Sequence, residues 1–323
     1  MIYDEKKVAI VIPLFNDSGN IGRAIESAVA QQMPDGYTHK IIVVDDCSTD
    51  DSAAVAEQLC SHYPNLRVYR QQMNGGPSVA RNRALSETDA AWFTPLDSDD
   101  LMRETRVAEL LRVALERDLD MVADNLLMTS EDSPKETMRT LWPEKPEGPI
   151  DLTASYFIDH SYNMETERSE LGFLKPLIHR RCLGGRVAPY RDDLRFGEDF
   201  ELYTRLLLDG ARAQLVDPAG YFAVIRKGSA SHVQSGRDHE RLARVSRSIS
   251  RRPDLSADER HAIRRHRVYS EKEWAWWTMI EGVKTQDLAK ALSAFFISPA
   301  AAVHVLDQLI NQLVVRLRSR EHR

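Results

Sequence analysis

Cysteine is scarce in this sequence of 323 residues: only Cys47, Cys60 and Cys182 occur, and they lie far apart. No C-x-x-C pair of the metal-binding kind is present, and an odd number of scattered thiols argues against a disulfide framework. This cysteine usage fits the reducing cytoplasm. Hydrophobic residues, by contrast, make up 42% of the chain, which is enough to bury a large core.

Excess positive charge and long apolar runs are also lacking. The net charge is -6, whereas a general nucleic-acid binder is usually basic, so we expect no nucleic-acid partner. No apolar run reaches the ~18 residues that would suggest a transmembrane helix. The opening residues, MIYDEKKVAIVIPLF, do not fit a signal peptide because acidic residues precede the apolar run. The sequence contains no internal repeat and no low-complexity segment.

Apolar runs alternate with amphipathic segments along the first part of the chain. The apolar runs predict strands at residues 8–15, 40–44, 66–69, 91–96 and 121–128. The segments between them predict helices at residues 21–32, 48–62, 78–85 and 102–117. Further along we expect a polar excursion at 130–150, a strand within 174–183, a helix at 200–208 and a strand at 220–225. This order predicts an α/β fold with an open, mostly parallel sheet flanked by helices.

The composition becomes helix-rich and arginine-rich near residue 236, so we expect an α/β domain at residues 1–235 and a helical region at 236–323. Three helices are expected here, with caps at Ser256, Thr285 and Ser298. Arginines together with Trp274, Trp276 and Trp277 fit a segment that lies on an anionic membrane surface. A helical subdomain packed on the α/β domain, or a homodimer contact, explains the same pattern, and these alternatives stay open.

Acidic residues follow three of the predicted strands. They are Asp17, Asp45, Asp46, Asp97, Asp99 and Asp100. The C-terminal ends of parallel strands lie at one edge of a sheet, where open α/β sheets bind their ligands. An isolated D-x-D-D segment is best explained as a solvated turn before a helix. Three acidic strand ends instead indicate a site, and carboxylate oxygens suit a hard divalent cation.

Five segments of the chain resemble the family 2 glycosyltransferases. They occur in family order over residues 6–210 and are VAIVIPLFND, IIVVDDCSTDDS, NGGPSVARNRAL, WFTPLDSDD and FGEDFEL. The resemblance implies a GT-A fold, a nucleotide-sugar donor, inversion at the sugar and a divalent metal (Mn2+ or Mg2+); the helical C-terminal extension is expected from the composition described above. Within the family the chain looks most like bacterial exopolysaccharide glucosyltransferases of the succinoglycan type. That likeness implies transfer of glucose from UDP-glucose to a lipid-linked oligosaccharide at the inner face of the cell membrane.

The acidic strand ends acquire roles through this resemblance. Asp99 matches the last acid of the family's DxD motif, which implies that it binds the metal. Asp97 matches the first acid, which implies a contact with the metal or with the ribose. Asp100 either takes a direct part or caps the following helix.

The nucleotide-binding segments of the family match a second group of positions. They are Pro13, Phe15, Asn16, Asp45, Asp46, Asn74 and Arg81. Phe15 is expected to stack near the base, and Asp46 to accept a hydrogen bond from the uracil ring. Asp45 is expected to hold its loop, and Arg81 to approach the nucleotide. For Arg81 a helix-face salt bridge is the alternative, and Asn16 and Asn74 either shape turns or face the donor.

Inversion requires a carboxylate that takes the proton of the attacking hydroxyl. Asp199 matches the family's base, and Glu198 is expected to orient the acceptor or the base. The alternative for this pair is an acidic helix N-terminus favoured by the helix dipole. Arg226, Ser229 and His232 fall on a loop that would close over the diphosphate, and a metal contact by His232 is a minor alternative.

Two other functions fit parts of the sequence. A sugar-nucleotide pyrophosphorylase has a related fold, but its first strand leads into a glycine-rich, basic phosphate loop. Here that position holds the segment PLFND at residues 13–17 instead. A non-catalytic binding or scaffold protein would be expected to lose either the DxD motif or the Glu-Asp pair, and this chain has both.

Overall fold

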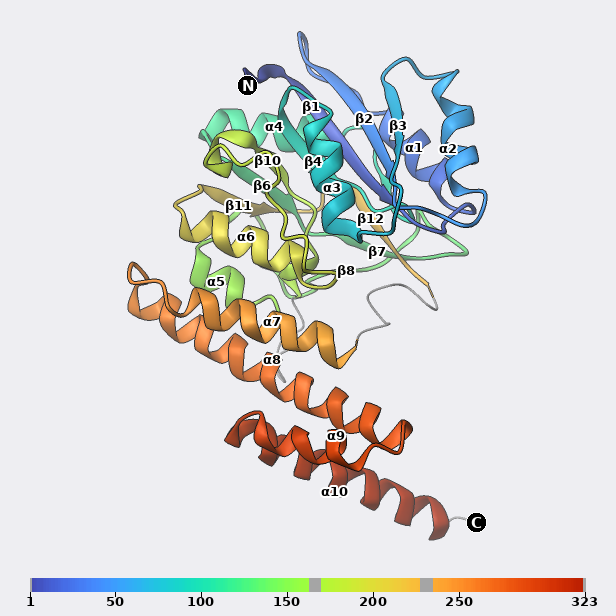
Figure 1. Cartoon of the computed structure of the whole chain (residues 1–323). Helices are drawn as coiled ribbons and strands as arrows, with labels where there is room; N and C mark the ends of the chain where they lie inside the picture. The colour runs from blue at the N-terminus through green and yellow to red at the C-terminus, as the bar shows by residue number, and fades with distance from the viewer. Residues whose placement is uncertain (1, 163–169, 227–234, 322–323) are drawn as a thin grey trace. The chain divides into compact units, whose positions relative to one another are not determined.

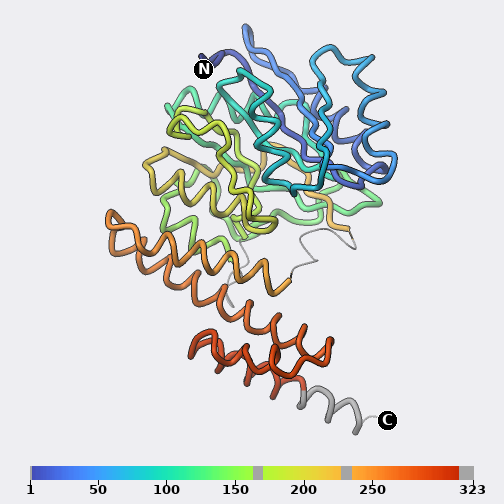
Figure 2. The backbone as a smooth tube through the Cα atoms, in the orientation of Figure 1, coloured from blue at the N-terminus to red at the C-terminus, as the bar shows by residue number. Residues whose placement is uncertain are grey.

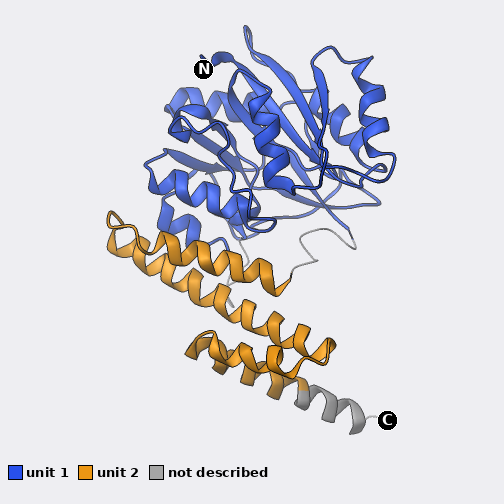
Figure 3. Ribbon diagram, in the orientation of Figure 1, with its two compact units in different colours: residues 1–227 blue, residues 228–323 orange. Residues whose placement is uncertain are grey.

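The computed structural model describes residues 2–162, 170–226 and 235–321, with side chains as far as residue 312 (Figure 2). Ser229 and His232, which we expected near the donor diphosphate, lie outside the described residues. The chain forms two compact units, Met1–Lys227 and Gly228–Arg323 (Figure 3). Each unit has its own secondary structure and its own buried residues.

Within the described residues, the first unit is built around an eight-stranded sheet in the order β3-β2-β1-β4-β10-β6-β11-β9 (Figure 1). The strands are β1 (Asp4–Leu14), β2 (Thr38–Asp45), β3 (Leu66–Arg70), β4 (Ala90–Pro95), β6 (Met121–Asp124), β9 (Ile150–Asp151), β10 (Leu177–His179) and β11 (Ala213–Val216). Strands β3, β2, β1 and β4 are parallel, whereas β10 runs antiparallel to β4 and β6. The mostly parallel α/β sheet predicted from the sequence is confirmed.

Helices flank this sheet (Figure 1). They are α1 (Ile21–Val29), α2 (Ser52–Cys60), α3 (Pro77–Ser86), α4 (Arg106–Arg117), α5 (Ala154–Asp159) and α6 (Glu198–Leu208), with short 3-10 turns η1 (Leu171–Phe173) and η2 (Arg180–Leu183). Residues 8–12 of β1 have no exposed surface, because layers of side chains cover both faces of this central strand. The sequence analysis missed α5 and the strands β9 and β11.

A second, four-stranded sheet lies beside the first within the described residues, in the order β5-β12-β7-β8. Its strands are β5 (Leu101–Met102), β7 (Leu127–Ser130), β8 (Thr137–Thr140) and β12 (Tyr221–Ile225). The single strand predicted at 121–128 is therefore wrong: it is β6 and β7, which belong to different sheets. The Asn125 side chain holds the break, because it donates to Trp142 O at 2.8 Å and accepts from Trp142 N at 3.0 Å. The polar excursion at 130–150 contains β8 and the start of β9.

The second unit consists of helices. They are α7 (Gly236–Ile249), α8 (Ala257–Lys284), α9 (Leu288–Ser293), the 3-10 turn η4 (Ala294–Phe296) and α10 (Pro299–Glu321). The predicted capping box of Ser256 and Glu259 is confirmed, and Ser298 accepts from Ala301 N as expected. The predicted cap at Thr285 is wrong, because Asp287 accepts from Lys290 N at the start of α9. No helix in the described part of the chain combines the length and apolarity needed to cross a bilayer.

Candidate active site

The acidic strand ends meet at one edge of the large sheet because β1, β2 and β4 are parallel and in register. Leu14, the last residue of β1, pairs with Asp45 at the end of β2, and Val11 pairs with Pro95 at the end of β4. The segments that follow these strands therefore share one edge. Ser98 Oγ, on the segment after β4, donates to Asp17 Oδ2 after β1 at 2.7 Å.

Asp97 lies between two cationic side chains. Arg81 Nη2, from α3, donates to Asp97 Oδ1 at 2.8 Å, and Lys175 Nζ lies 3.2 Å from Asp97 Oδ2. Both cations are almost fully buried, whereas the Asp97 side chain is 31% exposed. Burial alone would raise the pKa of Asp97, but the charges of Lys175 and Arg81 outweigh it and lower the pKa to about 2. This carboxylate is therefore ionised at neutral pH.

The same two cations also hold the Glu-Asp pair at the start of α6. Arg81 Nη1 donates to Glu198 Oε1 at 2.7 Å and lies 3.6 Å from Asp199 Oδ1. Lys175 Nζ donates to Asp199 Oδ2 at 2.8 Å. Burial and the charge of Asp199 raise the pKa of Glu198, against the opposing charge of Arg81. Arg81 and Lys175 thus join the DxD motif to the Glu-Asp pair, which lies about a hundred residues later in the chain.

Asp99 has a different cationic partner, Arg226, which follows β12. Arg226 Nε lies 2.8 Å from Asp99 Oδ2, and Arg226 Nη1 donates to Asp17 Oδ1 at 2.9 Å. Burial, together with the charges of Asp97 and Asp17, raises the pKa of Asp99 to about 6 although Arg226 opposes this. Of the loop residues expected near the diphosphate, Arg226 is the one that the structure describes, and it does reach the DxD segment.

Asp97 and Asp99 fit a hard divalent cation in their chemistry, because each presents carboxylate oxygens and the charge of one acts on the other. Among the described residues, however, no three acidic, histidine or cysteine side chains converge on one point in the way a complete protein metal site requires. Asp99 and Asp97 would therefore supply part of a coordination shell, and donor oxygens or water the rest.

Asp100 has a structural role that the sequence did not indicate. It accepts from the Tyr221 hydroxyl at 2.8 Å and from Val224 N at 2.8 Å, so it fastens β12 to the end of β4. The alternative that Asp100 caps the next helix is wrong, since α4 begins at Arg106 with Thr105 before it. Asp97 N in turn donates to the Tyr221 hydroxyl at 3.1 Å. The segment that carries the DxD motif is thereby fixed to β12.

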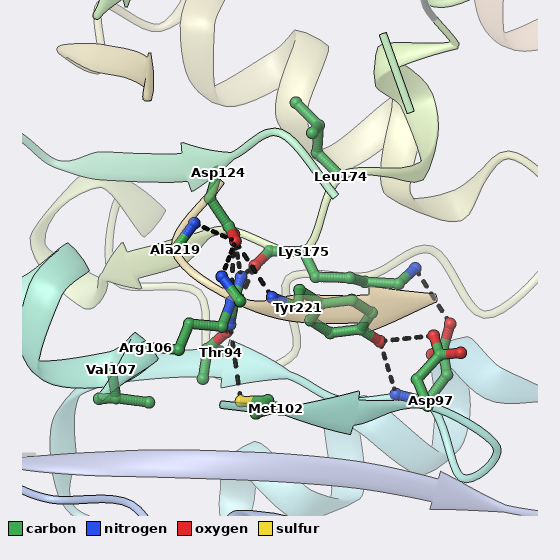
Figure 4. A network of polar contacts seen from close by, with 12 residues as sticks. Thr94, Asp97, Met102, Arg106, Val107, Asp124, Leu174, Lys175, Ala219 and Tyr221 are labelled. Carbon is green, nitrogen blue, oxygen red and sulfur yellow. Dashed lines mark hydrogen bonds and ion pairs between the residues drawn. The ribbon is translucent and has the colours of Figure 1, made fainter. Parts of the chain in front are cut away.

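A buried ion pair, which the sequence did not indicate, contacts Lys175 and Tyr221 behind the site residues (Figure 4). Arg106 and Asp124, both without exposed surface, pair at 2.7 Å. Asp124 Oδ2 also accepts from three consecutive backbone N–H groups, at residues 219–221. Arg106 Nη2 donates to the backbone oxygen of Lys175, and its guanidinium lies 4.9 Å from the Tyr221 ring centre. The buried pair thus fixes two segments: Asp124 holds the start of β12, and Arg106 holds the backbone of Lys175.

Asp46 and Asn74, which the family resemblance assigns to the nucleotide, connect the loop after β2 to the turn before α3. Asp46 accepts from Gln71 Nε2 and Gly75 N at 2.8 Å each and from Gly76 N at 2.7 Å. Gly76 has a φ of 89°, which favours glycine. Asn74 Nδ2 donates to Asp46 O at 3.1 Å. A carboxylate offers about four lone-pair sites, so Asp46 retains capacity for one further donor. Its expected contact with the uracil ring remains a prediction.

The family resemblance also assigns Phe15, Asn16 and Asp45 to nucleotide binding. Phe15, which follows Pro13 and Leu14, is 47% exposed, so its ring is accessible for stacking. Asn16 Oδ1 accepts from Thr49 N at 2.8 Å, which ties the loop after β1 to the loop after β2. Asp45 is fully buried and accepts from Ser48 N at 3.3 Å, in line with a role in holding its loop.

Comparison with known proteins agrees with this arrangement. A sequence model described as Glycosyl transferase family 2 matches residues 9–193. The chain is 31% identical to the succinoglycan biosynthesis protein ExoU of Rhizobium meliloti, with 96% of this chain and 89% of that protein covered.

Two solved structures share the fold. S. aureus TarS 1-349 in complex with UDP-GlcNAc superposes with a TM-score of 0.63 at 17% identity, over 89% of this chain and 90% of that one. The mannosyltransferase PcManGT of Pyrobaculum calidifontis, in complex with GDP-Man and Mn2+, has a TM-score of 0.56 at 16% identity, over 95% and 81%. The expected GT-A fold with a helical C-terminal region is confirmed. The chain belongs to glycosyl transferase family 2.

Proposed function

We propose that this glycosyltransferase moves a hexose, glucose from UDP-glucose, to a lipid-linked oligosaccharide in exopolysaccharide biosynthesis, with inversion at the sugar. The observation that carries the proposal is the ionic cluster in which Arg81 and Lys175 join Asp97 to Glu198 and Asp199. In this cluster the DxD segment lies next to the Glu-Asp pair, which supports a one-step displacement in which donor and acceptor meet. The likeness to ExoU supports the exopolysaccharide pathway, and that to TarS with UDP-GlcNAc supports a UDP-sugar.

In the proposed mechanism, Asp199 takes the proton from the acceptor hydroxyl as it attacks the sugar carbon. Among the described residues no group donates a hydrogen bond to Asp199 Oδ1, so its lone pairs are unoccupied. Asp97, held ionised by Lys175 and Arg81, faces the donor. Asp99 would hold Mn2+ or Mg2+, whose Lewis acidity stabilises the charge that builds on the leaving diphosphate. Arg226, beside Asp99, is the cation placed to contact that diphosphate.

Neither rival function is favoured by the structure. The segment after β1 holds Asn16 and Asp17 in a turn tied to the loop after β2, and it carries no basic phosphate loop. The Glu-Asp pair lies beside the DxD motif rather than apart from it, which a binding scaffold would not need.

The donor is tested with a panel of nucleotide sugars by thermal shift and by donor turnover, with Mn2+, with Mg2+ and with a chelator. We expect UDP-glucose with Mn2+ to stabilise the protein most, because binding to the folded state alone raises the melting temperature. GDP-mannose and ADP-glucose are the controls for recognition of the uracil nucleobase. If another nucleotide sugar raises the melting temperature more and is turned over faster, that sugar is the donor instead of UDP-glucose. No response to any nucleotide sugar would contradict the transferase proposal.

For the C-terminal unit we propose peripheral contact with an anionic membrane surface. Its α9–α10 end exposes large apolar side chains, which are Leu288 (77%), Leu292 (60%), Phe296 (87%), Val303 (59%) and Leu306 (50%). Exposed apolar groups of this number are costly in water and stabilising when they enter a lipid interface. A lipid-linked acceptor would lie at the same surface.

We expect the Leu292→Glu and Phe296→Glu double variant to lose co-sedimentation with anionic vesicles by about tenfold or more. Leu115→Glu, on α4 of the first unit and 50% exposed, is the matched control and should sediment as the wild type does. Light scattering of the same proteins tests the homodimer alternative. Membrane contact is contradicted if the wild type does not sediment with vesicles. If the wild type also forms a dimer that the double variant does not form, this apolar face is a dimer contact.

A further inference from the structure

Lys175 is a buried lysine in a run of apolar residues, FLKPLI, immediately before β10. Its side chain is 7% exposed, and its Nζ is the one atom that contacts both Asp199 Oδ2 (2.8 Å) and Asp97 Oδ2 (3.2 Å) in the described structure. Figure 4 shows the Nζ directed toward Asp97, at the far end of the network from Asp124. No motif of the sequence analysis includes this residue.

The position of Lys175 is fixed at its backbone as well as at its amine. Its backbone oxygen accepts from Arg106 Nη2 and, at 3.4 Å, from Thr94 Oγ1. Arg106 is itself held by Asp124, and Pro176 follows Lys175 with a restricted φ. A free lysine side chain samples many rotamers. Lys175 is buried and held at both its backbone oxygen and its amine, so these contacts restrict it to one conformation.

The contact with Lys175 makes the two oxygens of Asp199 unequal. Oδ2 accepts the hydrogen bond from Lys175, whereas Oδ1 is buried, accepts no hydrogen bond from the described residues and lies 3.6 Å from Arg81 Nη1. A general base needs a free lone pair for the proton it takes. Oδ1 keeps both of its lone pairs, whereas Oδ2 shares one with the Lys175 ammonium.

The bridge also relates the base to the donor side. Asp97 and Asp199 come from different elements, the end of β4 and the start of α6, and their like charges would repel if the cation between them were absent. The Lys175 ammonium lies between them and can contact both because its donors surround a single nitrogen. Lys175 therefore acts together with Arg81, which contacts the same two acids, in setting the distance between Asp97 and Asp199.

We propose that Lys175 is a positioning residue for the transfer reaction: it directs Asp199 Oδ1 toward the acceptor hydroxyl and fixes the base relative to the donor-binding Asp97. This inference rests on the proposed function. A direct contact of Lys175 with the donor diphosphate, or a purely structural neutralisation of the two acids, would be different roles for the same residue, and the kinetics separate them.

The test compares Lys175→Met and Lys175→Arg with the control Lys145→Met. Lys145 has a 2% exposed side chain paired with Asp217 and lies in a loop outside the cluster, so the control removes another buried ammonium. For Lys175→Met we expect kcat to fall about 100-fold, as for a misplaced catalytic group. The Kd of UDP and the KM of the acceptor should change less than about threefold. Lys145→Met should keep the wild-type kcat.

Lys175→Arg keeps the inference testable if the methionine variant does not fold. We expect the arginine variant to retain the thermal stability of the wild type but to lose at least about tenfold in kcat, because a planar guanidinium cannot place one atom between the two carboxylates. Full activity of either variant would overturn the inference. A rise in the Kd of UDP that matches the loss of rate would do so too, and would make Lys175 a donor ligand. A wild type that transfers no sugar from any donor would count against the proposed function itself, whereas an active wild type with unaffected variants contradicts the role of Lys175 alone.

Discussion

Asp199→Asn should lower the rate of sugar transfer by about 10²- to 10⁴-fold, the range of a lost general base. Asparagine has nearly the shape of aspartate and can still accept the hydrogen bond of Lys175 through its amide oxygen. It has no carboxylate lone pair with which to take the proton of the acceptor hydroxyl. Because the substitution lies on the acceptor side, the Kd of UDP should stay within about threefold of the wild type. Initial rates and calorimetric titration with UDP provide the two measurements.

A matched control is available on the same helix. Glu201 is a buried carboxylate of α6 that pairs with Arg205 at 2.9 Å and takes no part in the ionic cluster around Lys175. Glu201→Gln should therefore reduce stability without a specific loss of kcat. If Asp199→Asn turns over at the wild-type rate, or if Glu201→Gln loses as much rate at equal folded fraction, the assignment of Asp199 as base is wrong.

The parallel half of the sheet was predictable from sequence because its strands are buried on both faces. The runs at residues 8–15, 40–44 and 91–96 are almost entirely apolar, and β1, β2 and β4 appear where they were expected. The prediction was wrong at residues 121–128, where the apolar pattern continues across a change of sheet. The break depends on contacts that are distant in sequence: β6 and β7 pair with different sheets, and Asn125 between them bonds Trp142, 17 positions away.

Short peripheral elements were missed for a related reason. Strand β9 has two residues and β11 has four, so neither is long enough to show a period of its own. Both form because a neighbouring strand offers an edge to pair with, as β6 does for β11 and β11 does for β9. Local propensity does not contain that information, and tertiary pairing decides the structure.

The acids of the DxD motif and of the Glu-Asp pair were found, as were Arg81 and Arg226, but the cations Lys175 and Arg106 were not. Motif matching identified Asp97, Glu198 and Asp199, and the structure adds that Arg81 contacts all three. Lys175 was missed because a single lysine in an apolar run matches no motif and no period. Its place inside the apolar run FLKPLI nevertheless indicated a buried lysine, and a lysine is almost never buried unless it is paired with an acid.

Asp100 shows a further limit of sequence reasoning. The sequence places it beside Asp99 in one acidic segment, and nothing local distinguishes the two. In the structure the Asp100 side chain accepts from Tyr221 and Val224, more than a hundred residues away, whereas Asp99 faces Arg226. The difference arises from the turn after β4 and from the position of β12, which reaches Asp100 through Tyr221 and Val224.

Asp99→Asn should remove the response of donor binding and turnover to Mn2+. Burial and the neighbouring acids raise the pKa of Asp99 to about 6, so the charge of this carboxylate is poorly stabilised in its surroundings. A divalent cation offsets that cost, and the asparagine side chain is a much weaker ligand for it. The stabilisation of charge on the leaving diphosphate is worth several kcal/mol, so we expect kcat/KM at fixed Mn2+ to fall by about 100-fold or more. Titrating Mn2+ into chelator-treated enzyme, with donor binding followed by calorimetry, measures the response.

The control must separate metal binding from the ion pair that Asp99 makes with Arg226. Asp17→Asn removes the other carboxylate that holds Arg226, while it leaves the DxD motif intact. If displacement of Arg226 causes the loss, both variants should fail alike and Mn2+ should still stimulate what activity remains. If Asp99 binds the metal, only Asp99→Asn becomes insensitive to Mn2+, and in the presence of chelator it should bind UDP as the wild type does. An Asp99→Asn enzyme with an unchanged Mn2+ requirement would show that the metal is held elsewhere. Both variants are needed because Arg226 and the divalent cation compete for the Asp99 carboxylate in this arrangement.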